Sequence, residues 1–549
     1  MLIRADADGG LTVLDALRKH RVYIPAVCGG KGTCGKCAVR IKAAGKPPAT
    51  VLACETYVTE DIEATPVSDD AGFEILTGYA GGADDFEPRF TLSEFNRTEI
   101  GRSLSESLDI RLGGVETPLG LIKKLSGMIN PSGGVTAEKF YILADGRRAV
   151  GALRKKNAAA YGIAIDIGTT TVCMQLVDLL DGAERANCSL INRQRKFGAD
   201  VISRIQNSEG DNFFELTRLI RDDIRAGVGE LLKKRGLSYS DVYQAAVSGN
   251  TTMIQFFLGI PCVSHGHSPF TATFTGLREF GCREIFGDGF LTCNITVMPG
   301  ISAFVGSDIV SGLLLCQKED DSLLFIDIGT NGEMALVANG RVVCTSTAAG
   351  PAFEGGNISC GTGSVPGAIA SIRYENGKFI FKTIAGAPPS GLCGTGAIDL
   401  VAEMLDNGMM DETGSLDDSA ADGVKVTDGV VFTQKDVREM QLAKSALRSG
   451  IECLINSSGT SYAEIGRVII AGGFGFKLNL DSAVRIGMIP EELKAKVSVA
   501  GNSSLGGCVK ALVQSGAASR AVAIANGCEE INLSEDRLFN RLFTEFMYF

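Results

Sequence analysis

The chain has 549 residues, 45% of them hydrophobic, and a formal net charge of −11. This length exceeds what one hydrophobic core supports, so several domains are expected. The negative charge argues against a nucleic-acid-binding surface. The sequence shows no signal-like N-terminal segment and no apolar run of about eighteen residues, so we expect a cytoplasmic protein that does not enter a membrane. Sixteen cysteines spread through a chain of this length do not indicate a disulfide framework.

Four cysteines near the N-terminus are spaced as ligands of a metal cluster. Cys28, Cys34 and Cys37 lie in one glycine-rich loop, and sixteen residues separate Cys37 from Cys54. Thiolates arranged in this way hold a 2Fe–2S cluster, and the glycines let backbone N–H groups approach its sulfurs. Structural zinc is the alternative, but zinc sites favour two pairs of ligands, whereas these ligands fall three and one. The spacing therefore predicts a 2Fe–2S cluster and a role in electron transfer.

Residues 1–62 around these cysteines are expected to form a β-grasp, ferredoxin-type domain. Thr12 and Asp15 have the spacing of a capping box at the start of a short helix, and a strand is expected over residues 38–41. The segment before the helix is short for this fold. Its first hairpin is therefore expected to be truncated.

An acidic segment and a small domain are expected next. Between Pro47 and Pro88 there are ten acidic residues and no Lys, Arg or His. We interpret residues 63–88 as a solvated acidic linker, with an acidic docking face for a basic redox partner as the alternative. Residues 89–157 have the pattern of a small α/β module in which we recognise no chemistry.

Two similar segments then follow. Each is a buried apolar strand that ends in Asp-Ile-Gly-Thr, and the two aspartates, Asp166 and Asp327, are 161 positions apart. A repeat of this length indicates two similar lobes that face one another. In each copy the Asp can hold a hydrated Mg²⁺, while backbone N–H groups and Thr or Asn side chains bind phosphate oxygens. The predicted phosphate-binding residues are Gly168, Thr169, Thr170, Thr171, Gly329, Thr330, Asn331 and Gly332.

Further glycine turns complete a predicted ATP site. One follows a strand at residues 468–471 and could pass under an adenine and its ribose, and another lies where a strand enters a helix. Each turn alone is weak evidence, but the ordered set predicts binding of ATP with Mg²⁺. The predicted catalytic residues are Asp166, Asp327 and Glu333, and Glu354 is either a water- or Mg²⁺-orienting group or an ordinary loop carboxylate. The residues of the two further turns are Gly249, Asn250, Gly472, Gly473, Phe474 and Gly475.

The ordered motifs resemble the acetate and sugar kinase, Hsp70 and actin superfamily of two-lobed ATPases. With a 2Fe–2S domain in front, the chain resembles the reductive activators of corrinoid proteins, and residues 197–205, 350–355 and 501–506 match that family too. The resemblance implies an α/β fold in which the ferredoxin-type domain and the middle domain precede an actin- and Hsp70-like ATPase domain at 158–549. The lobes of this ATPase domain are expected at about 158–320 and 321–549.

The same resemblance implies an ATP-dependent enzyme. It would pass one electron from the 2Fe–2S cluster to the Co(II) ion of a corrinoid protein in a methyltransferase system and regenerate Co(I). An unidentified low-potential donor would supply the electron, and we expect a homodimer. ATP would serve either to dock the corrinoid protein so that the cobalt potential rises or to release the product complex.

Two other classes of function stay open. A small-molecule kinase of this superfamily would not need an attached ferredoxin domain, and a redox-gated regulatory ATP-binding protein would not need both aspartates. His265 and His267 are expected to be loop residues or histidines with satisfied hydrogen bonds. A second iron–sulfur cluster at Cys344, Cys360 and Cys393 is not expected, because the four-cysteine set already supplies an electron carrier.

Overall fold

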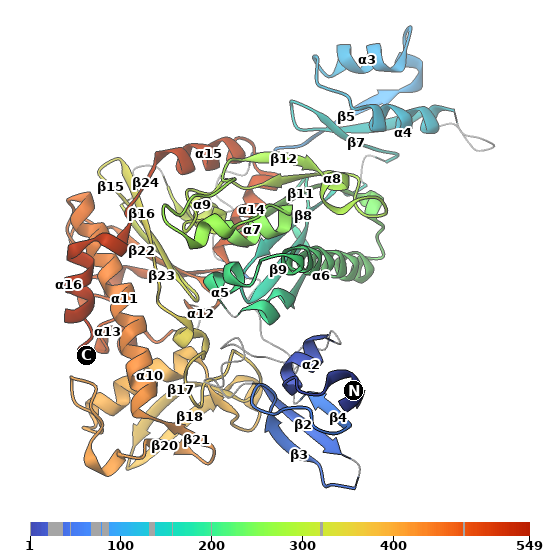
Figure 1. Cartoon of the computed structure of the whole chain (residues 1–549). Coiled ribbons are helices and arrows are strands. Elements are labelled where there is room, and N and C mark those ends of the chain that lie inside the picture. Colours follow the sequence, from blue (N-terminus) through green and yellow to red (C-terminus); the bar gives the residue numbers. More distant parts are fainter. Residues whose placement is uncertain are drawn as a thin grey trace.

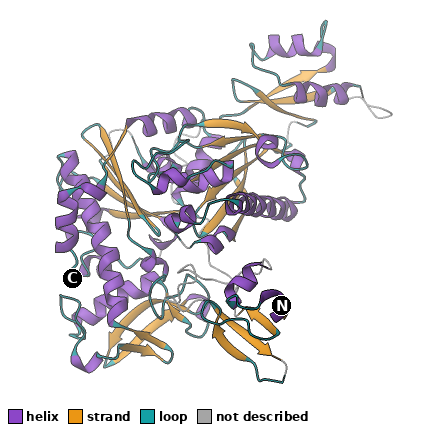
Figure 2. Ribbon diagram, viewed as in Figure 1, coloured by secondary structure: helices purple, strands orange, loops and turns teal. Residues whose placement is uncertain are grey.

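The structure is a computed structural model that describes residues 2–19, 37–43, 45–66, 78–79, 87–130, 138–155, 158–198, 200–318, 322–475 and 478–549. These residues form a mixed α/β protein whose strands make six sheets (Figures 1 and 2). Within the described ranges, no helix combines the length and the apolar content that crossing a bilayer requires.

The N-terminal domain is a small sheet with a helix packed on it. Its strand order is β1 (Leu2–Ile3), β4 (Ile62–Pro66), β2 (Ala38–Ala43) and β3 (Ala49–Leu52). β1 pairs with β4, and α1 (Ala5–Asp8) follows β1 where a hairpin would place its second strand. The expected truncation of the first hairpin is thus confirmed.

The helix of this domain, α2 (Val13–Lys19), begins as the capping pattern predicts. The Asp15 amide donates to Thr12 Oγ1 at 3.1 Å, which satisfies an N–H group that the first turn leaves without an intrahelical partner. The buried apolar cluster of the domain contains only residues between Ile3 and Ala64. The domain therefore has a hydrophobic core of its own.

The middle domain projects from the rest of the molecule (Figure 1). It contains β5 (Thr91–Asn96), β6 (Lys139–Ala144) and β7 (Ala149–Leu153), with α3 (Leu104–Arg111) and α4 (Leu119–Ile129). Gly151 of β7 lies directly against Tyr243, because a Cβ atom at Gly151 would be 2.2 Å from that aromatic ring. Lys124 lies 5.1 Å from the centre of the same ring. Tyr243 is therefore a main contact between the middle domain and the first lobe.

The two large sheets repeat one topology. In each, the strand that carries the Asp-Ile-Gly motif has an antiparallel hairpin on one side and a parallel strand on the other. The first sheet has the order β10 (Glu184–Ile191), β9 (Thr171–Asp178), β8 (Tyr161–Ile167), β11 (Val242–Gly249), β13 (Asn294–Val297), β12 (Arg278–Gly281). The second has the order β23 (Val497–Gly501), β22 (Arg467–Ala471), β14 (Leu323–Ile328), β15 (Gly332–Ala338), β16 (Arg341–Thr347), β24 (Cys528–Glu530).

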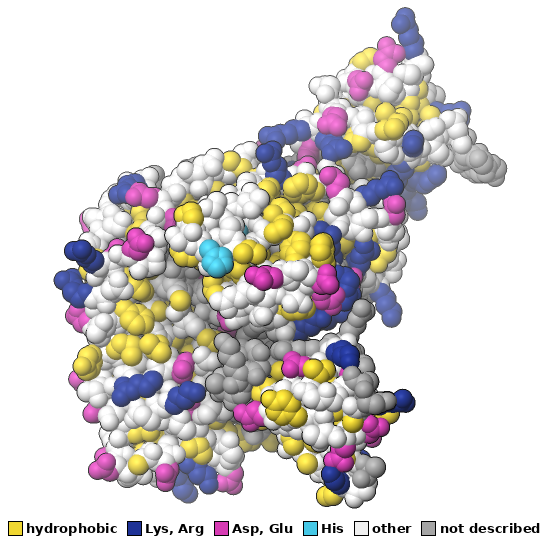
Figure 3. Space-filling view, in the orientation of Figure 1, with side chains coloured by type: hydrophobic (Ala, Val, Ile, Leu, Met, Phe, Trp, Pro, Cys, Tyr) yellow, Lys and Arg dark blue, Asp and Glu magenta, His cyan; other side chains and the backbone are white. Residues whose placement is uncertain are grey.

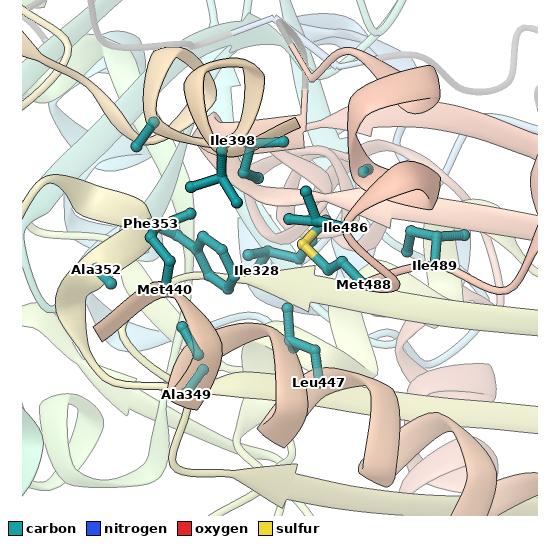
Figure 4. Close-up of a cluster of buried hydrophobic side chains, with 14 of the residues drawn as sticks. Ile328, Ala349, Ala352, Phe353, Ile398, Met440, Leu447, Ile486, Met488 and Ile489 are labelled. Atoms are coloured by element: carbon teal, nitrogen blue, oxygen red, sulfur yellow. The ribbon is translucent and has the colours of Figure 1, made fainter. Parts of the chain in front are cut away.

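Strand alternation determines where each aspartate points. Ile326 and Ile328 are buried in the core of the second lobe, where Ile328 lies near Phe353 and Met488 (Figure 4). Because side chains alternate between the two faces of a strand, Asp327 lies on the opposite face from both isoleucines. Asp327 itself is only partly buried, as is Asp166 in β8.

Helices cover the outer faces of the two lobes. On the first lobe the longest is α6 (Asp211–Arg235), whose last turn contains Lys233, Lys234 and Arg235, a favourable position for cations at a helix C-terminus. Figure 3 shows Lys and Arg side chains gathered over this part of the first lobe. The other first-lobe helices are α5 (Val201–Gln206), α7 (Thr251–Leu258) and α8 (Cys282–Phe286).

The second lobe is larger because two small sheets extend it (Figure 1). These sheets contain β17 (Ala368–Glu375), β18 (Lys378–Thr383) and β19 (Gly391–Leu392), and β20 (Val424–Thr427) and β21 (Val430–Phe432). The helices of this lobe are α10 (Gly394–Asp406), α11 (Gln434–Ser458), α12 (Gly472–Gly475), α13 (Leu480–Arg485) and α16 (Arg537–Glu545).

Helices α9 (Ser307–Cys316) and α14 (Ser503–Val513) pack against each other between the two lobes. α14 follows β23 of the second sheet, yet its apolar residues Leu505 and Leu512 are buried with Val177 of the first sheet. α9 contributes Leu313 to a cluster with Phe325 of the second sheet. The two helices therefore connect the lobes, and α15 (Ala517–Gly527) extends this layer.

The crossing of α9 and α14 yields a stability prediction. A Cβ atom at Gly507 of α14 would lie 2.2 Å from the carbonyl oxygen of Ser311, so Gly507→Ala forces the helices apart. We expect this substitution to lower the free energy of unfolding by about 1–3 kcal/mol, the usual cost of overpacking.

Gly127→Ala in α4 is the matched control, because no atom lies within 4 Å of its added Cβ. It should stabilise the protein by up to about 1 kcal/mol through helix propensity. Thermal unfolding of both variants checks the pair. Equal changes in unfolding temperature for the two variants would contradict the close contact of α9 with α14 at Gly507.

Candidate functional site

A cavity of about 280 Å³ lies between the two Asp-Ile-Gly turns. Asp166 and Asp327 both line it, although they belong to different lobes. The walls also include the start of α9, the loop between β23 and α14, and the turn after β22. The cavity is thus enclosed by corresponding ends of the repeated strands.

The turn after β8 is held through its carbonyl oxygens. Asn192 Nδ2 donates to the Gly168 oxygen at 2.9 Å, and the Asn192 amide donates to the Thr170 oxygen at 2.9 Å. The buried guanidinium group of Arg204 donates to the oxygen of Thr169. Because these oxygens are engaged, the turn can offer its N–H groups to an anion, as phosphate-binding turns do.

Glu354 connects the two turns across the cavity. It lies at the end of a 3₁₀ helix, Pro351–Glu354, in a loop of the second lobe. Thr330 Oγ1 donates to Glu354 Oε2 at 2.7 Å, and Thr170 Oγ1 donates to the same oxygen at 3.4 Å. One carboxylate oxygen therefore accepts a hydroxyl from each lobe.

The two aspartates are positioned differently. Asp166 accepts hydrogen bonds from Asn502 Nδ2 at 2.9 Å and from Ser504 Oγ at 2.7 Å. Asp327 lies against Gly472, where a Cβ atom would be 2.7 Å from Asp327 Oδ1. Gly472 also has φ +86°, a backbone conformation that other residues rarely adopt. Glycine is thus required at this position for two reasons.

Most of the predicted binding residues line this one cavity. Asn250 also orients the first turn, since its Nδ2 donates to Thr169 Oγ1 at 3.0 Å. Asn331 Nδ2 donates to Glu333 Oε1 at 3.2 Å. The predicted residues found in the lining are Asp166, Gly168, Thr169, Thr170, Thr171, Asn250, Asp327, Gly329, Thr330, Asn331, Glu333, Gly472 and Gly473.

Two predicted glycines instead serve chain packing. A Cβ atom at Gly249 would be 2.5 Å from the carbonyl oxygen of Ile167, and one at Gly332 would be 2.2 Å from the Leu447 side chain. Neither residue lines the cavity. Residues 472–475 form the short helix α12, where a simple turn was expected, and the side-chain surroundings of Phe474 and Gly475 lie outside the described residues.

Sequence reasoning missed several residues of the site. Asp308 in the first turn of α9 lines the cavity, as do Asn502 and Ser504. The Gly501–Gly506 stretch supported the family resemblance, but its side chains were assigned no role. Asp308 gave a local signal, an acidic residue in a helical first turn after Gly306, but that pattern is common. Only the fold brings these residues to Asp166.

The carboxyl groups of the cavity have raised pKa values. Burial, together with the nearby Asp308, Asp166 and Glu354, raises the pKa of Asp327 to about 8. Burial also raises the pKa of Asp308 to about 7 and raises those of Asp166, Glu333 and Glu354. Uncompensated negative charges in one buried space are unfavourable, so the site fits a cation.

Magnesium fits this carboxyl set in its hydrated form. Mg²⁺ prefers oxygen ligands and usually retains several waters beside one or two carboxylates and phosphate oxygens. In the part of the chain that the structure describes, no three His, Cys, Asp or Glu side chains form a group that could hold a metal directly. Asp166 and Asp327 could therefore hold Mg²⁺ through water and nucleotide oxygens.

Two of the four predicted cluster ligands lie side by side. The Sγ atoms of Cys37 and Cys54 are 3.1 Å apart, and the Cys54 amide donates to Cys37 Sγ at 3.5 Å. Two thiolates on one tetrahedral metal ion with bonds of about 2.3 Å are separated by about 3.7 Å, so these two sulfurs lie closer together than bound ligands would, yet near enough for one iron to bind both after a small outward shift. Cys28 and Cys34 lie outside the described residues.

The remaining histidine and cysteine expectations can also be compared with the structure. His265 is buried and bonds to Thr252 Oγ1 at 3.0 Å and to Gln255 Nε2 at 2.7 Å, so its expected satisfied state is confirmed. Cys344 belongs to the cluster of apolar side chains around α9, whereas Cys393 belongs to another cluster beside β19. Cys344 and Cys393 therefore lie in different apolar clusters.

Three family profiles match the chain. A 2Fe–2S iron–sulfur cluster binding domain matches residues 3–59, the middle region of RACo matches 161–320, and the C-terminal ASKHA domain of RACo matches 321–549. The corrinoid activation enzyme RamQ of Eubacterium limosum is 30% identical over 93% of this chain and 92% of the relative. This chain belongs to the family of reductive activators of corrinoid proteins.

Two further comparisons extend this assignment. The [Co(II) methylated amine-specific corrinoid protein] reductase of Methanosarcina barkeri is 28% identical over 63% of this activator-family chain and 68% of the relative. The solved structure of a reductive activator for corrinoid, iron–sulfur protein has a TM-score of 0.75 and 29% identity, covering 98% of this chain and 95% of that one. The family assignment establishes a 2Fe–2S domain together with an ATP-binding ASKHA domain.

The raised pKa values predict that Mg²⁺ stabilises this activator-family protein in a pH-dependent way. Folding without metal raises the pKa of Asp327 to about 8, so the folded state keeps a proton that the unfolded state has released. The free energy of unfolding without metal therefore falls as pH rises from the ordinary pKa of Asp, 3.8, to about 8. Mg²⁺ binds the deprotonated carboxylates, so it should raise Tm more at pH 8 than at pH 6.

Calorimetry with and without Mg²⁺ at both pH values measures this effect. The Asp308→Asn, Asp327→Asn double variant should show a smaller difference between the two pH values. An Mg²⁺-induced shift in Tm that is equal at both pH values in the unsubstituted protein would contradict the assigned cation site.

Proposed function

We propose that this protein is an ATP-dependent reductive activator that passes one electron from a 2Fe–2S cluster in its N-terminal domain to the Co(II) ion of a corrinoid protein, regenerating Co(I). The observation that carries the proposal is one chain containing both a pair of adjacent cysteine thiols and a carboxyl-lined cavity between two phosphate-type turns. The corrinoid substrate is supported by the printed names of the relatives. A low-potential electron donor and a homodimer stay predictions.

ATP would occupy the cavity with its phosphates between the two turns. Residues 168–171 would bind phosphate oxygens from the first lobe and residues 329–331 from the second, while Gly473 and Phe474 would lie under the adenine. Asp166, Asp327 and Glu333 are the proposed catalytic residues. When bound, Mg²⁺ would neutralise charge on the phosphates. The hydrogen bonds of Glu354 would change when the lobes close, because it bonds to threonines of both turns.

The cluster would be held by Cys28, Cys34, Cys37 and Cys54. When bound, it supplies a one-electron carrier. The Cys54 amide already donates to Cys37 Sγ, and hydrogen bonds to cluster sulfurs raise the reduction potential because they stabilise the extra negative charge. The backbone N–H group of Cys54 would thus raise the reduction potential of the cluster.

Transfer to cobalt requires an input of free energy if the Co(II)/Co(I) couple lies below that of the cluster. Plant-type 2Fe–2S centres lie near about −400 mV. A deficit on the order of 100–200 mV costs roughly 2–5 kcal/mol for one electron, since about 59 mV is a tenfold disadvantage. A ligand that binds one conformation more tightly than another can supply this amount. Closure of the two lobes around ATP is the conformational change that we assign to this role.

The experiment that tests this function follows cobalt absorbance under anaerobic conditions. Reduced protein, ATP–Mg²⁺ and a Co(II) corrinoid protein are mixed, and the ATP hydrolysis rate is measured with and without the corrinoid protein. We expect corrinoid-stimulated hydrolysis and formation of Co(I). Asp327→Ala should slow both by about 100-fold or more, because it removes a charge that orients the reacting phosphate.

Asp428→Ala is the matched control, since Asp428 is 97% exposed in the same lobe and pairs with Lys425 at the surface. It should behave as the unsubstituted protein does. The Asp327→Ala protein should still accept an electron from a chemical reductant at its cluster. A small molecule that stimulates hydrolysis and becomes phosphorylated would instead establish a kinase.

A second prediction concerns the cluster ligands. Cys37→Ser should lower bound iron and abolish the reduced spectrum of the 2Fe–2S cluster, because thiolates are its preferred ligands. Cys528→Ser, at the start of β24 in the second lobe, should leave iron content unchanged. Iron and sulfide analysis with electron paramagnetic resonance checks both variants. Full iron content in Cys37→Ser protein would refute the ligand assignment.

A further inference from the structure

The loop that holds Asp166 also binds the segment between the N-terminal and middle domains. Asn502 Nδ2 donates to Asp166 Oδ2 at 2.9 Å, while the Asn502 amide donates to the carbonyl oxygen of Gly78 at 3.1 Å. Beside it, Tyr79 forms an antiparallel bridge with Gly501. One residue is thus bonded both to a carboxylate of the cavity and to the segment that leads to the ferredoxin-type domain.

The Tyr79 side chain packs between the two lobes. It contacts the apolar cluster that contains Leu505 and Val177, and also the cluster that contains Leu313 and Phe325. Gly506 makes room for its ring, because a Cβ atom there would lie 2.8 Å from Tyr79 Cδ2. Burial raises the pKa of the Tyr79 phenol. The ring is therefore in contact with both bodies whose relative position closure of the lobes would change.

The loop at Gly501 and Asn502 is also a connection between the lobes. β23 belongs to the second sheet, whereas α14, which begins at Ser503, packs on strands β8 and β11 of the first sheet. Gly501 has φ +70°, and Asn502 Oδ1 caps α14 by accepting from the Leu505 amide at 2.9 Å. A hinge motion is absorbed at such element ends, so rotation of one lobe would move the backbone that binds Gly78 and Tyr79.

The other end of this segment is fixed to the far end of α14. The Ser515 amide donates to the Glu87 oxygen at 2.9 Å, and the Arg89 amide donates to the Val513 oxygen at 2.8 Å. Arg89 Nη1 adds a hydrogen bond to the Ala511 oxygen at 3.0 Å. These contacts tie the middle-domain side to α14 itself. Along the chain, Gly78 follows the N-terminal domain, whose last strand β4 ends at Pro66 and which has a core of its own. A displacement of Gly78 and Tyr79 therefore acts on the chain that leads back to that domain.

We propose that Gly78 and Tyr79 couple the nucleotide state of the cavity to the position of the ferredoxin-type domain. Closure of the lobes around the nucleotide shifts Asn502 with Asp166, and the shift is transmitted through the Asn502–Gly78 hydrogen bond and the Tyr79 ring. Tyr79 is a positioning residue, because it is not among the described residues that line the nucleotide cavity. The inference rests on the proposed function in taking ATP–Mg²⁺ as the ligand of the cavity.

Hydrogen exchange of the full-length protein tests the coupling without any corrinoid protein. Amide exchange is compared with no nucleotide, with ADP–Mg²⁺ and with ATP–Mg²⁺. We expect exchange in the peptide that contains Gly78 and Tyr79 to change by about fivefold or more, the lower end of ordinary coupling between sites. The peptide that contains Glu87 and Arg89 should not change. No change at Gly78 and Tyr79, or an equal change in both peptides, would overturn the proposal.

Substitution of Tyr79 separates coupling from simple packing. Tyr79→Ala should leave the ATP Kd and the unstimulated ATPase rate within about twofold, yet lower the number of cobalt ions reduced per ATP hydrolysed by about fivefold or more. Tyr79→Phe keeps the ring and should retain the ratio found in the unsubstituted protein.

The remaining outcomes of this experiment count against the proposal. An unchanged ratio in Tyr79→Ala, or a parallel loss of ATP binding and reduction, would mean that Tyr79 has only a structural role. If Tyr79→Ala does not fold, exchange in the unsubstituted protein decides. If the unsubstituted protein reduces no corrinoid protein, the proposed function fails, but the hydrogen-exchange result still tests the coupling.

Discussion

Mutual repulsion among carboxyl groups gathered in one cavity is the constraint around which the ATPase domain is arranged. The two repeated sheets deliver Asp166 and Asp327 to one cavity from opposite lobes, and Asp308, Glu333 and Glu354 add further negative charge. Such a set is tolerated only when protonated, hydrogen-bonded or neutralised by a cation. The raised pKa of Asp327 reflects this repulsion. Hydrogen bonds donated to Glu354 by the Thr330 hydroxyl and to Asp166 by the Asn502 side-chain amide offset part of it.

The groups that offset the repulsion among the carboxyl groups come from both lobes. The hydrogen bonds of the cavity therefore depend on how the lobes are placed. Glu354 accepts hydroxyl groups from Thr170 and Thr330, and Asp166 of the first lobe is held by Asn502, which follows a strand of the second sheet. A ligand that changes the charge balance would therefore also change the preferred separation of the lobes. This linkage would let ATP binding change the conformation of the protein. The Asn502 amide also bonds to Gly78, in the segment that leads back to the N-terminal domain.

The redox domain is built on different principles. Its sheet is small, and α1 stands where the second strand of a first hairpin would be expected. It brings two thiols together, since the sulfurs of Cys37 and Cys54 lie 3.1 Å apart although 16 residues separate them in the sequence. A compact domain of this kind can move as a unit, which suits a carrier that must meet both an electron donor and an acceptor.

Local pattern was sufficient to predict much of the site. Cysteine spacing and the repeated Asp-Ile-Gly-Thr segments rely on short-range chemistry, because a turn that binds phosphate needs its glycine and its hydroxyl groups within a few residues. These positions, including Asp166, Thr170, Asp327 and Thr330, line the cavity. Gly249 and Gly332 look equivalent in sequence but serve packing, since the atoms that crowd them belong to Ile167 and Leu447 elsewhere in the chain.

By itself, then, the sequence determined the cofactor classes, the repeated strands and the phosphate-type turns, because each depends on residues that are near neighbours along the chain. Only the tertiary structure decided that Asn502 and Ser504 hold Asp166, that Asp308 joins the carboxyl set, and that Tyr79 lies between the lobes. The Asn502 and Ser504 bonds to Asp166 join residues more than 300 positions apart. The physical cause of these arrangements is the packing of α9 and α14 between the lobes, which no local pattern encodes.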